Sequence, residues 1–374
     1  MKKYKSRDFG VELFRLLGSL IVIGVHSCLN VFHDNICDLS RLYISCCFAD
    51  GVAIFWLITG FFLYSETSYS KLLRKLRDRT IIPMLCYGMF YFYFSSFFIN
   101  GTFTHHNTAD YLFILHCLFR FRNPFPTFGQ SWYLFTYIFV YFLFPIIKPF
   151  IMYLDADPRR IRTFLFISLL MLLINDFTYN ELLMFSHHSV NAIFPAILQT
   201  IWGHILFQKR HYFTSSRYAI LCAFLFPIIN MIRMFIQHYL FRIKNGNGHI
   251  LYWYSTIGQT CACVICIFCF SFSNVIKTMS TRTVSQSIAL SINYLASLTF
   301  DIYLIHLFVR DLLTAYKFDA WLFTAIIGKD ETFVSTFLYS ISMIIIIFIL
   351  SALLTYVKSF VIYTCKHIVH FSTS

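Results

Sequence analysis

An arginine and a histidine, Arg15 and His26, lie eleven residues apart in the first long apolar segment of the chain. An α-helix turns by about 100° per residue, so eleven steps leave the two side chains within about 20° of one another on one face. They would be separated by roughly 16 Å along the helix axis. Ionisable side chains at membrane depth are costly and usually face a polar cavity, so this aligned pair is a candidate functional site.

Both groups can do chemistry that few other side chains can. A neutral imidazole can accept a proton or act as a nucleophile, and a guanidinium can bind and orient anionic groups. Glu12 lies three residues before Arg15, within reach of an ion pair. The structural alternative is that Arg15 extends to the lipid headgroups and that His26 hydrogen-bonds a neighbouring helix. The alignment of the two groups favours the functional interpretation.

The elements that position these residues are predicted to be membrane-spanning helices. Of the 374 residues, 58% are hydrophobic, 20% aromatic and 13% charged, which is the composition of an integral membrane protein. A helix needs about 20 apolar residues to cross the bilayer. The fold class is therefore predicted to be an all-α, polytopic membrane protein. The ten predicted spans are 12–33, 43–65, 81–99, 131–152, 163–177, 191–207, 218–240, 250–273, 289–315 and 333–356.

The placement of basic residues predicts how these spans are oriented. With both termini on the cytoplasmic side, 19 of the 30 Lys and Arg residues fall in the six segments that would lie inside. Cytoplasmic loops are enriched in Lys and Arg, so the sequence predicts an N-in, C-in topology. The net charge of +13 is then explained by attraction to anionic membrane lipids. Nucleic acid is not a predicted partner, because the charges are divided among short loops instead of forming one stripe.

The cysteines do not predict a metal site. Four of the twelve lie within one predicted span, where cysteine serves as a small apolar residue: Cys261, Cys263, Cys266 and Cys269. A zinc site needs tetrahedral ligands and usually a turn between the cysteine pairs. No metal is therefore expected.

The chain is predicted to be one integral-membrane domain over residues 1–374, because no linker, low-complexity tract or internal repeat is evident. Residues 356–374 mix apolar and basic side chains and are predicted to form a cytoplasmic interfacial tail. The apolar run 111–119 is too short to cross the bilayer and is predicted to be re-entrant or interfacial.

Five short motifs follow one another along nearly the whole chain. They are the pair Arg15 and His26; the stretch from Gly51 to Leu63, with Thr59 before Gly60; the basic segment from Arg74 to Pro83; Trp132-Tyr-Leu with Pro145; and Phe300-Asp-Ile-Tyr-Leu-Ile-His306. In this order they resemble the motifs of membrane-bound acyltransferase family 3, whose bacterial members acylate O-antigen, capsule and related glycans. Thr59 stands where the family usually has serine, and Asp301 stands where it has glycine.

The resemblance implies an O-acetyltransferase of the bacterial inner (cytoplasmic) membrane. Acetyl-CoA would be a co-substrate, with no bound cofactor, and the acceptor would be a hydroxyl of O-antigen, capsule or a lipid-linked precursor. Such a transfer needs a base near the hydroxyl and stabilisation of a tetrahedral oxyanion. His26 is expected to be the base or a covalent acyl carrier. Arg15, with Glu12, is expected to bind the donor or to orient the site.

The basic segment after the second span is the expected donor site. Arg74, Arg77 and Arg79 would bind the phosphates of coenzyme A, and the last two are best placed because they lead directly into the third predicted span. The same segment could instead serve only as a topology anchor. Further residues expected to support the site are Thr59, Trp132, Tyr303 and His306. The sequence leaves open whether His306 is catalytic or only packs as a buried polar residue.

Three alternatives to acetyl transfer also remain open. The acyl group could be succinyl. A transporter or flippase of lipid-linked sugars would likewise place polar groups inside a helical bundle, but would move its substrate without consuming acyl-CoA. A structural subunit of a polysaccharide-export complex would not need His26.

Overall fold

The protein is built from helices throughout the part of the chain that the structure describes. The computed structural model describes residues 8–27, 39–102, 108–119, 129, 131–177, 192–243, 254–279, 282–328 and 331–372, and no strand occurs among them. The helices are α1 (Phe9–Ser27), α2 (Leu39–Cys47), α3 (Gly51–Leu63), α4 (Tyr69–Leu76), the π-helical turn η1 (Arg77–Ile81), α5 (Ile82–Asn100), α6 (Thr108–Phe119), α7 (Ser131–Phe142), α8 (Phe144–Asp155), α9 (Pro158–Phe177), α10 (Ile193–Gln208), the 3₁₀ turn η2 (Arg210–Phe213), α11 (Ser216–Ile243), α12 (Thr256–Met279), α13 (Arg282–Ala315), α14 (Phe318–Ile326) and α15 (Phe333–Ser372).

Seven of the described helical segments are long and apolar enough to cross a membrane. They are Phe9–Ser27, Leu39–Leu63, Tyr69–Ile99, Ser216–Tyr239, Thr256–Ile276, Ser287–Ala315 and Phe333–Ser359. The pair α7 and α8 adds an eighth if it is counted as one span. Helix α9 spans the predicted range 163–177, and the shorter apolar helix α10 overlaps the predicted range 191–207. The prediction of an all-α, polytopic membrane protein is thus confirmed, whereas the number of ten crossings stays a prediction.

The range 131–152, predicted as one span, is bent in the structure. Helix α7 ends at Phe142, α8 begins at Phe144, and the two axes differ in direction by 68°. Pro145 lies in the first turn of α8. Proline lacks the N–H that would bond to the carbonyl four residues earlier, so a helix that meets a proline tends to end and a new one can begin with it.

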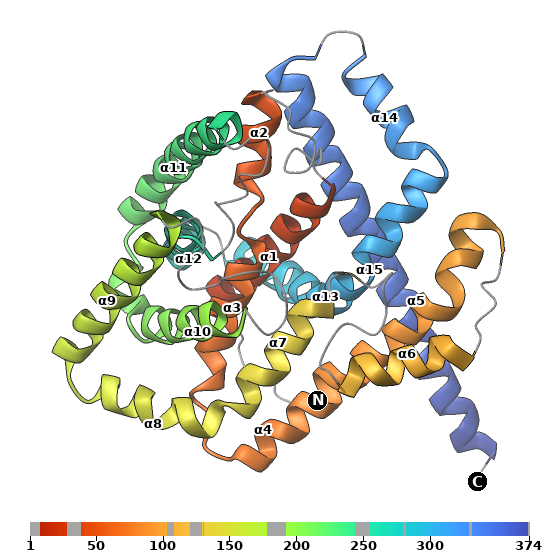
Figure 1. Cartoon of the computed structure of the whole chain (residues 1–374), viewed down its shortest axis with the longest axis horizontal. Coiled ribbons are helices and arrows are strands. Elements are labelled where there is room, and N and C mark those ends of the chain that lie inside the picture. The colour runs from red at the N-terminus through yellow and green to blue at the C-terminus, as the bar shows by residue number, and fades with distance from the viewer. Residues whose placement is uncertain are drawn as a thin grey trace.

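Helices α1 and α3 lie at the centre of the molecule and pack against each other, with α12 beside both, α13 against α1 and α10 against α3 (Figure 1). Two glycines allow the backbones of α3 and α10 to meet. A Cβ at Gly60 would lie 1.8 Å from the carbonyl oxygen of Thr200, and a Cβ at Gly203 would lie 2.1 Å from that of Leu57. Only glycine fits such a close crossing.

A buried ion pair joins the break between α2 and α3 to α11. The Nη1 atom of Arg233 donates to Oδ2 of Asp50 at 2.7 Å and to the carbonyl oxygen of Cys46 at 3.2 Å. Both charged side chains are almost completely buried. Ionisable groups within a membrane protein are normally paired in this way, because an isolated buried charge is very costly.

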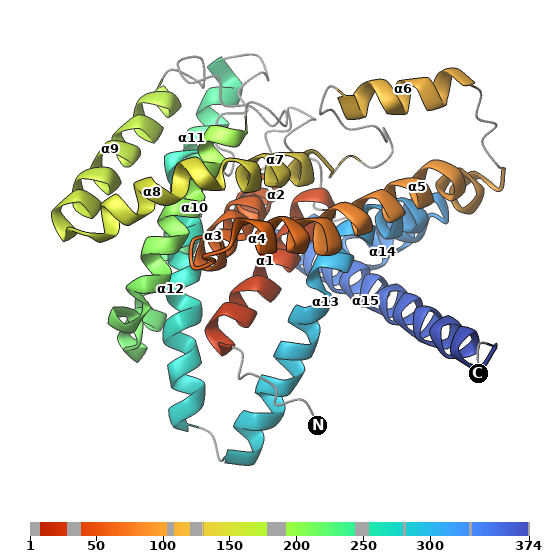
Figure 2. The ribbon, with the colours of Figure 1, turned by 90° about the horizontal axis from the view of Figure 1, so that it is seen from below.

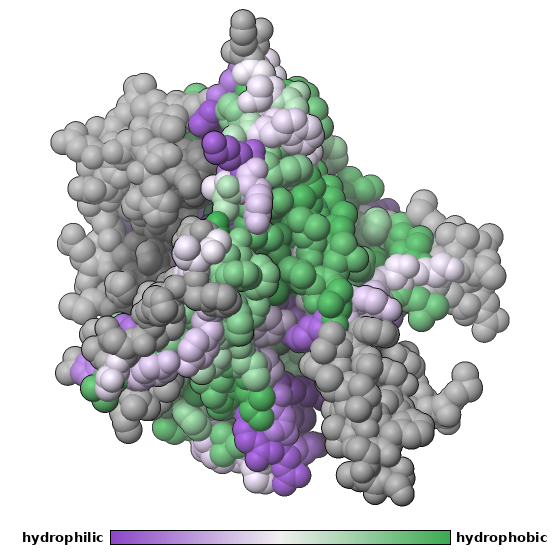
Figure 3. Space-filling view, turned by 90° about the vertical axis from the view of Figure 1, so that its right-hand side faces the viewer, coloured by the Kyte–Doolittle hydropathy of each residue, from purple (hydrophilic) through white to green (hydrophobic). Residues whose placement is uncertain are grey.

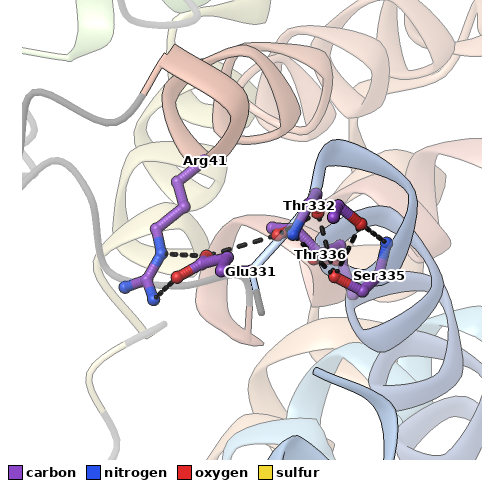
Figure 4. A network of polar contacts seen from close by, with 6 residues as sticks. Arg41, Glu331, Thr332, Ser335 and Thr336 are labelled. Carbon is purple, nitrogen blue, oxygen red and sulfur yellow. Dashed lines mark hydrogen bonds and ion pairs between the residues drawn. The ribbon is translucent and has the colours of Figure 1, made fainter. Parts of the chain in front are cut away.

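A second ion pair holds the start of α15 against α2 (Figure 4). The Nε and Nη2 atoms of Arg41 each lie 2.6 Å from one carboxylate oxygen of Glu331, which is a bidentate arrangement. The hydroxyl of Thr336 donates to the same carboxylate at 3.2 Å. Next to it, the backbone N–H of Ser335 donates to Thr332 Oγ1 at 3.2 Å, and the N–H of Thr332 donates to Ser335 Oγ at 2.9 Å. These reciprocal bonds cap the first turn of α15.

The surface is apolar over wide areas, as Figure 3 shows in green for one side of the molecule. Most of the described helices carry large exposed apolar side chains, which is expected for surfaces that face lipid. Helix α6 lies at the edge of the molecule beside α5, where the rings of Tyr111 and Phe92 are 5.9 Å apart (Figure 2). Helix α15 continues without a break to Ser372, so the predicted tail is the end of this long helix. Its interfacial position, like that of 111–119, stays a prediction.

Candidate active site

The site begins with the first turns of α1. The Oδ1 atom of Asp8 accepts hydrogen bonds from the backbone N–H groups of Gly10 at 3.0 Å and Val11 at 3.4 Å, which caps the helix. In the next turn, Nη1 of Arg15 donates to both carboxylate oxygens of Glu12, at 2.9 and 3.2 Å. The carboxylate of Glu12 is buried and therefore holds the guanidinium in one position.

Arg15 and Glu12 line a cavity of about 790 Å³, a volume typical of small-molecule sites. Its walls come from α1, α3, α4, η1, α5, α7, α13 and α15. Five of the residues predicted from the sequence line it: Glu12, Arg15, Thr59, Arg79 and Tyr303. The other predicted residues are not among those that line it: His26, Arg74, Arg77, Trp132 and His306.

The wall formed by α4 and η1 is basic. Lys75 donates a hydrogen bond to Oε2 of Glu66, and Nζ of Lys71 lies 3.5 Å from Oε1 of the same residue. The hydrogen bond from Lys75 holds the pKa of the Glu66 carboxyl below its usual range, so Glu66 remains ionised and neutralises part of the basic charge. Arg79 has no acidic partner among the described residues.

The three arginines of this segment have different surroundings. Arg79 lies in the π-helical turn η1, and such turns are frequent at functional sites. Arg77 forms an ion pair with its neighbour Asp78, with 2.7 Å between Nε and Oδ1. Arg74 is exposed on α4. Of the three arginines expected to bind the donor, only Arg79 therefore lines the cavity.

The sequence interpretation did not assign one further basic residue, Lys358, to the site. Lys358, on α15, donates a hydrogen bond to Oδ1 of Asp301 on α13, and the hydroxyl of Tyr87 donates to the same oxygen at 3.2 Å. Both Lys358 and Asp301 line the cavity. Asp301 carried the signal that could have revealed this group, because an acid within a predicted span needs a partner.

One wall of the cavity carries tyrosines at helical spacing. Tyr133, Tyr137 and Tyr141 follow one face of α7, and the hydroxyls of the last two lie 2.5 Å apart. On the facing helix, the hydroxyl of Thr59 donates to the carbonyl of Phe55 at 2.8 Å. Trp132 is not part of this wall; its ring packs edge-on against that of Tyr133 at 6.2 Å. The wall is thus polar at the hydroxyls and apolar along the rings.

A pair of histidines lies beyond the cavity, at the opposite end of α1 from Glu12. The rings of His26 and His306 have their centroids 5.2 Å apart, tilted by 40°. Nδ1 of His306 lies 2.7 Å from the carbonyl oxygen of Tyr303, and because a carbonyl can only accept, Nδ1 carries the proton. In the neutral ring, Nε2 then carries a lone pair. This buried atom has no hydrogen-bond partner among the described residues.

Tyr303 connects the cavity with the histidines. It lines the cavity, and its ring centroid lies 5.8 Å from that of His306. The rings of Tyr133 and Phe55 lie 5.6 and 6.0 Å from it, on the cavity side. The structure therefore brings the two predicted histidines together, and the ring of Tyr303 connects them to the cavity that Arg15 and Arg79 line.

Arg310 is a second residue that the sequence interpretation missed. Its Nη1 donates to the carbonyl oxygen of His26 at 3.1 Å, and its Nε and Nη2 bind the carboxylate of Asp311. Because it follows His306 by four residues on α13, both lie on the same helix face. An arginine inside the predicted span 289–315 was the available signal.

These features define what the site can do. The basic end of the cavity can bind an anionic group, and the tyrosine wall can accommodate a long, partly apolar arm. Beyond Tyr303, two imidazoles can supply a base, a nucleophile or both. Comparison with known families decides the class of chemistry. The family model described as an acyltransferase domain, that of acyltransferase family 3, matches residues 8–356.

The chain belongs to acyltransferase family 3. No match of significance was found among curated proteins or among solved structures. The matched range contains the residues that line the cavity, apart from Lys358, and both histidines. The protein is therefore a membrane acyltransferase.

Proposed function

We propose that this acyltransferase takes an acetyl group from cytoplasmic acetyl-CoA and transfers it to a hydroxyl of a surface glycan, in the bacterial inner membrane. The acceptor would be O-antigen, capsule or a lipid-linked precursor. The observation that carries the proposal is the cavity itself. It joins a basic end, where Arg79 lacks an acidic partner among the described residues, to the pair of Arg15 with the buried Glu12.

Acetyl-CoA suits the cavity because its two ends differ in chemistry. The nucleotide end carries phosphates, which guanidinium groups bind in a bidentate manner. The pantetheine arm is long, uncharged and partly apolar, which matches the tyrosine wall of α7. Arg79 would bind phosphate, and Arg15 would bind or orient the part of the donor that enters the bundle. Arg77 and Arg74, on the exposed surface, would attract the negatively charged phosphates of the donor toward the cavity.

The predicted orientation supports a cytoplasmic donor. The positive-inside distribution of Lys and Arg favours ten crossings with both termini inside, and in that topology α4 and η1 would lie on the cytoplasmic side. The cavity would then open to the side where acetyl-CoA is made. His26, in the last turn of α1, would lie toward the other side, where the glycan is carried.

In this proposal His26 is the base or the acyl carrier. A base accepts the proton of the acceptor hydroxyl as the new ester bond forms, and it typically contributes a factor of about 10² to 10⁴ in rate. We expect His26→Ala to insert normally and to lose glycan acetylation. Near-normal acetylation by this variant at equal expression would show that His26 is dispensable.

The function itself is tested by comparing surface polysaccharide from cells with and without the protein. Mass spectrometry should show acetyl groups that depend on the wild-type protein. Succinyl groups in their place would redefine the donor. Unchanged acylation, together with movement of a lipid-linked sugar without loss of acyl-CoA, would overturn acyl transfer in favour of transport.

A further inference from the structure

His306 is held in the state that a nucleophile requires. It is 1% exposed, its Nδ1 proton is bound by the carbonyl of Tyr303 at 2.7 Å, and its Nε2 has no hydrogen-bond partner among the described residues. Buried polar atoms are nearly always paired, so an unpaired one in a native site calls for a functional explanation. A lone pair that no neighbour uses is available to attack a carbonyl carbon.

His26 is less deeply buried than His306 and lies on a different helix. It lies in the last turn of α1, it is only half-buried, and its carbonyl is bound by Arg310 at 3.1 Å. Tyr303, which lines the donor cavity, contacts His306, and His306 contacts His26. The order along this path is therefore cavity, Tyr303, His306 and His26.

From this order we infer that the two histidines divide the transfer between them: His306 carries the acyl group and His26 takes the proton of the acceptor. The inference rests on the proposed function and deepens it. His306 is the histidine that contacts Tyr303 of the cavity wall. His26 lies at the other end of this path and is more exposed than His306, so an acceptor hydroxyl can reach it. One side chain could not easily reach both substrates if they approach from opposite sides of the membrane.

The two steps balance in atoms and charge. First, Nε2 of His306 forms a bond to the acetyl carbon, and the carbon–sulfur bond breaks with its electron pair on sulfur. Coenzyme A leaves as a thiolate, and acetyl-His306 is cationic with its Nδ1 proton retained. Second, the acceptor oxygen bonds to the acetyl carbon while its proton passes to His26, and the bond to Nε2 breaks. His26 then releases its proton to solvent, and the thiolate takes one up.

Burial favours this assignment. An acyl-imidazole reacts readily with water, so its lifetime depends on exclusion of solvent. His306 is enclosed, whereas His26 is more open. Nε2 of His306 is buried, and Tyr303 lines the cavity in contact with the His306 ring, so a thioester in the cavity would have to displace the Tyr303 ring to reach Nε2. Such a movement would admit the donor arm and then close behind the acylated histidine.

The test separates the two half-reactions in the purified full-length protein. Radiolabelled acetyl-CoA is the donor, and hydroxylamine replaces the glycan, because it captures an acyl-imidazole without needing a base. Hydroxylamine also reacts directly with the thioester, so the rate in an enzyme-free sample is subtracted. Wild type is expected to form acetohydroxamate and His26→Gln to retain this step while losing glycan acetylation. His306→Gln should lose both, by roughly 10²-fold or more. His211→Gln, an exposed histidine of η2, is the matched control and should behave as wild type.

A second measurement avoids dependence on how the variants fold. When acetyl-CoA is given to wild type without an acceptor, the labelled peptide found by mass spectrometry should come from α13. Label on the α1 peptide, or hydroxamate formation by His306→Gln at the wild-type rate, would overturn the division of roles. Glycan acetylation without any acetylated protein would overturn this inference alone. Absence of acetyl transfer from acetyl-CoA by wild type would overturn the proposed function as well.

Discussion

Arg79 and Arg77 are two residues apart in the turn η1, yet only Arg79 lines the cavity. Arg79 lines the cavity without an acidic partner among the described residues, whereas Arg77 is paired with Asp78 and is not among the lining residues. Lysine preserves the positive charge but cannot form the bidentate contact of a guanidinium. This difference allows phosphate binding to be separated from topology.

We expect Arg79→Lys to insert correctly and to raise the KM for acetyl-CoA by roughly three- to tenfold. A contact with a charged group contributes about 1.5 to 3 kcal/mol at most, and less where solvent screens it, as at this exposed side chain. Arg77→Lys is the matched control and should leave the KM nearly unchanged. Steady-state kinetics of both variants provide the measurement. Equal KM values for Arg79→Lys and wild type would leave the topology-anchor interpretation standing.

Residues that act within one helix turn could be anticipated from the sequence, and residues that meet across helices could not. The pairing of Glu12 with Arg15 follows from their spacing, and the structure contains it. The contact between His26 and His306 joins residues from opposite ends of the chain and depends on how α1 packs against α13. No periodicity in either helix encodes that packing. The helical alignment of His26 with Arg15 is likewise no guide to a shared cavity, because only Arg15 lines it.

At the scale of the helices, the crossing of α3 and α10 depends on Gly60. We expect Gly60→Ala to destabilise the protein by about 1 to 3 kcal/mol, because its Cβ would overlap the carbonyl of Thr200 and force the helices apart. Thermal unfolding in detergent should show a clearly lower Tm. Gly129→Ala is the control, since nothing lies within 4 Å of a Cβ there. An unchanged Tm for Gly60→Ala would contradict the close crossing.

The link between α2 and α15 should make stability depend on pH. The hydrogen bond from Arg41 holds the pKa of the Glu331 carboxyl below its usual range. The pair thus stabilises the protein above the unfolded-state pKa of about 4.3, and this contribution is lost as the pH falls through the lower folded-state pKa. Glu331→Gln should cost about 1 kcal/mol at neutral pH and progressively less in acid.

Unfolding curves of wild type and Glu331→Gln over a pH series provide the check. Arg41→Gln should cause a similar loss, and the double variant should add little, because both changes remove the same interaction. Fully additive losses would show that the two side chains stabilise the protein independently of one another.

Helix breaks were harder to predict than helices. Each predicted span overlaps a helix because long apolar runs are a strong signal. The bend at Leu143 was missed although Pro145 was visible, because prolines are also tolerated inside membrane helices. The break between α2 and α3 has no proline, and it lies beside the buried pair of Asp50 with Arg233, which only the tertiary structure brings together.

For the whole molecule, the predicted orientation can be tested by labelling. In a cysteine-free background, Ser70→Cys on α4 should react with an impermeant thiol reagent in inverted vesicles and not in intact cells. Thr324→Cys on α14, which is also exposed, should show the opposite pattern. Both lie outside the apolar cores of the predicted spans, so access depends only on the side of the membrane. Labelling of Ser70→Cys from outside would overturn both the topology and the proposed route of the donor.

The buried pair of Asp50 and Arg233 has a consequence for how the chain is made. An arginine near the middle of a membrane helix opposes insertion by about 2.5 to 3.5 kcal/mol when it has no partner. Asp50 precedes Arg233 by 183 residues, so during synthesis it leaves the ribosome first. Asp50 would therefore already be in the membrane, able to pair with Arg233, when helix α11 inserts. Correct insertion of α11 would therefore depend on the order in which the helices are synthesised. A fragment of the chain that begins after α3 lacks Asp50, so α11 of such a fragment would insert into the bilayer inefficiently.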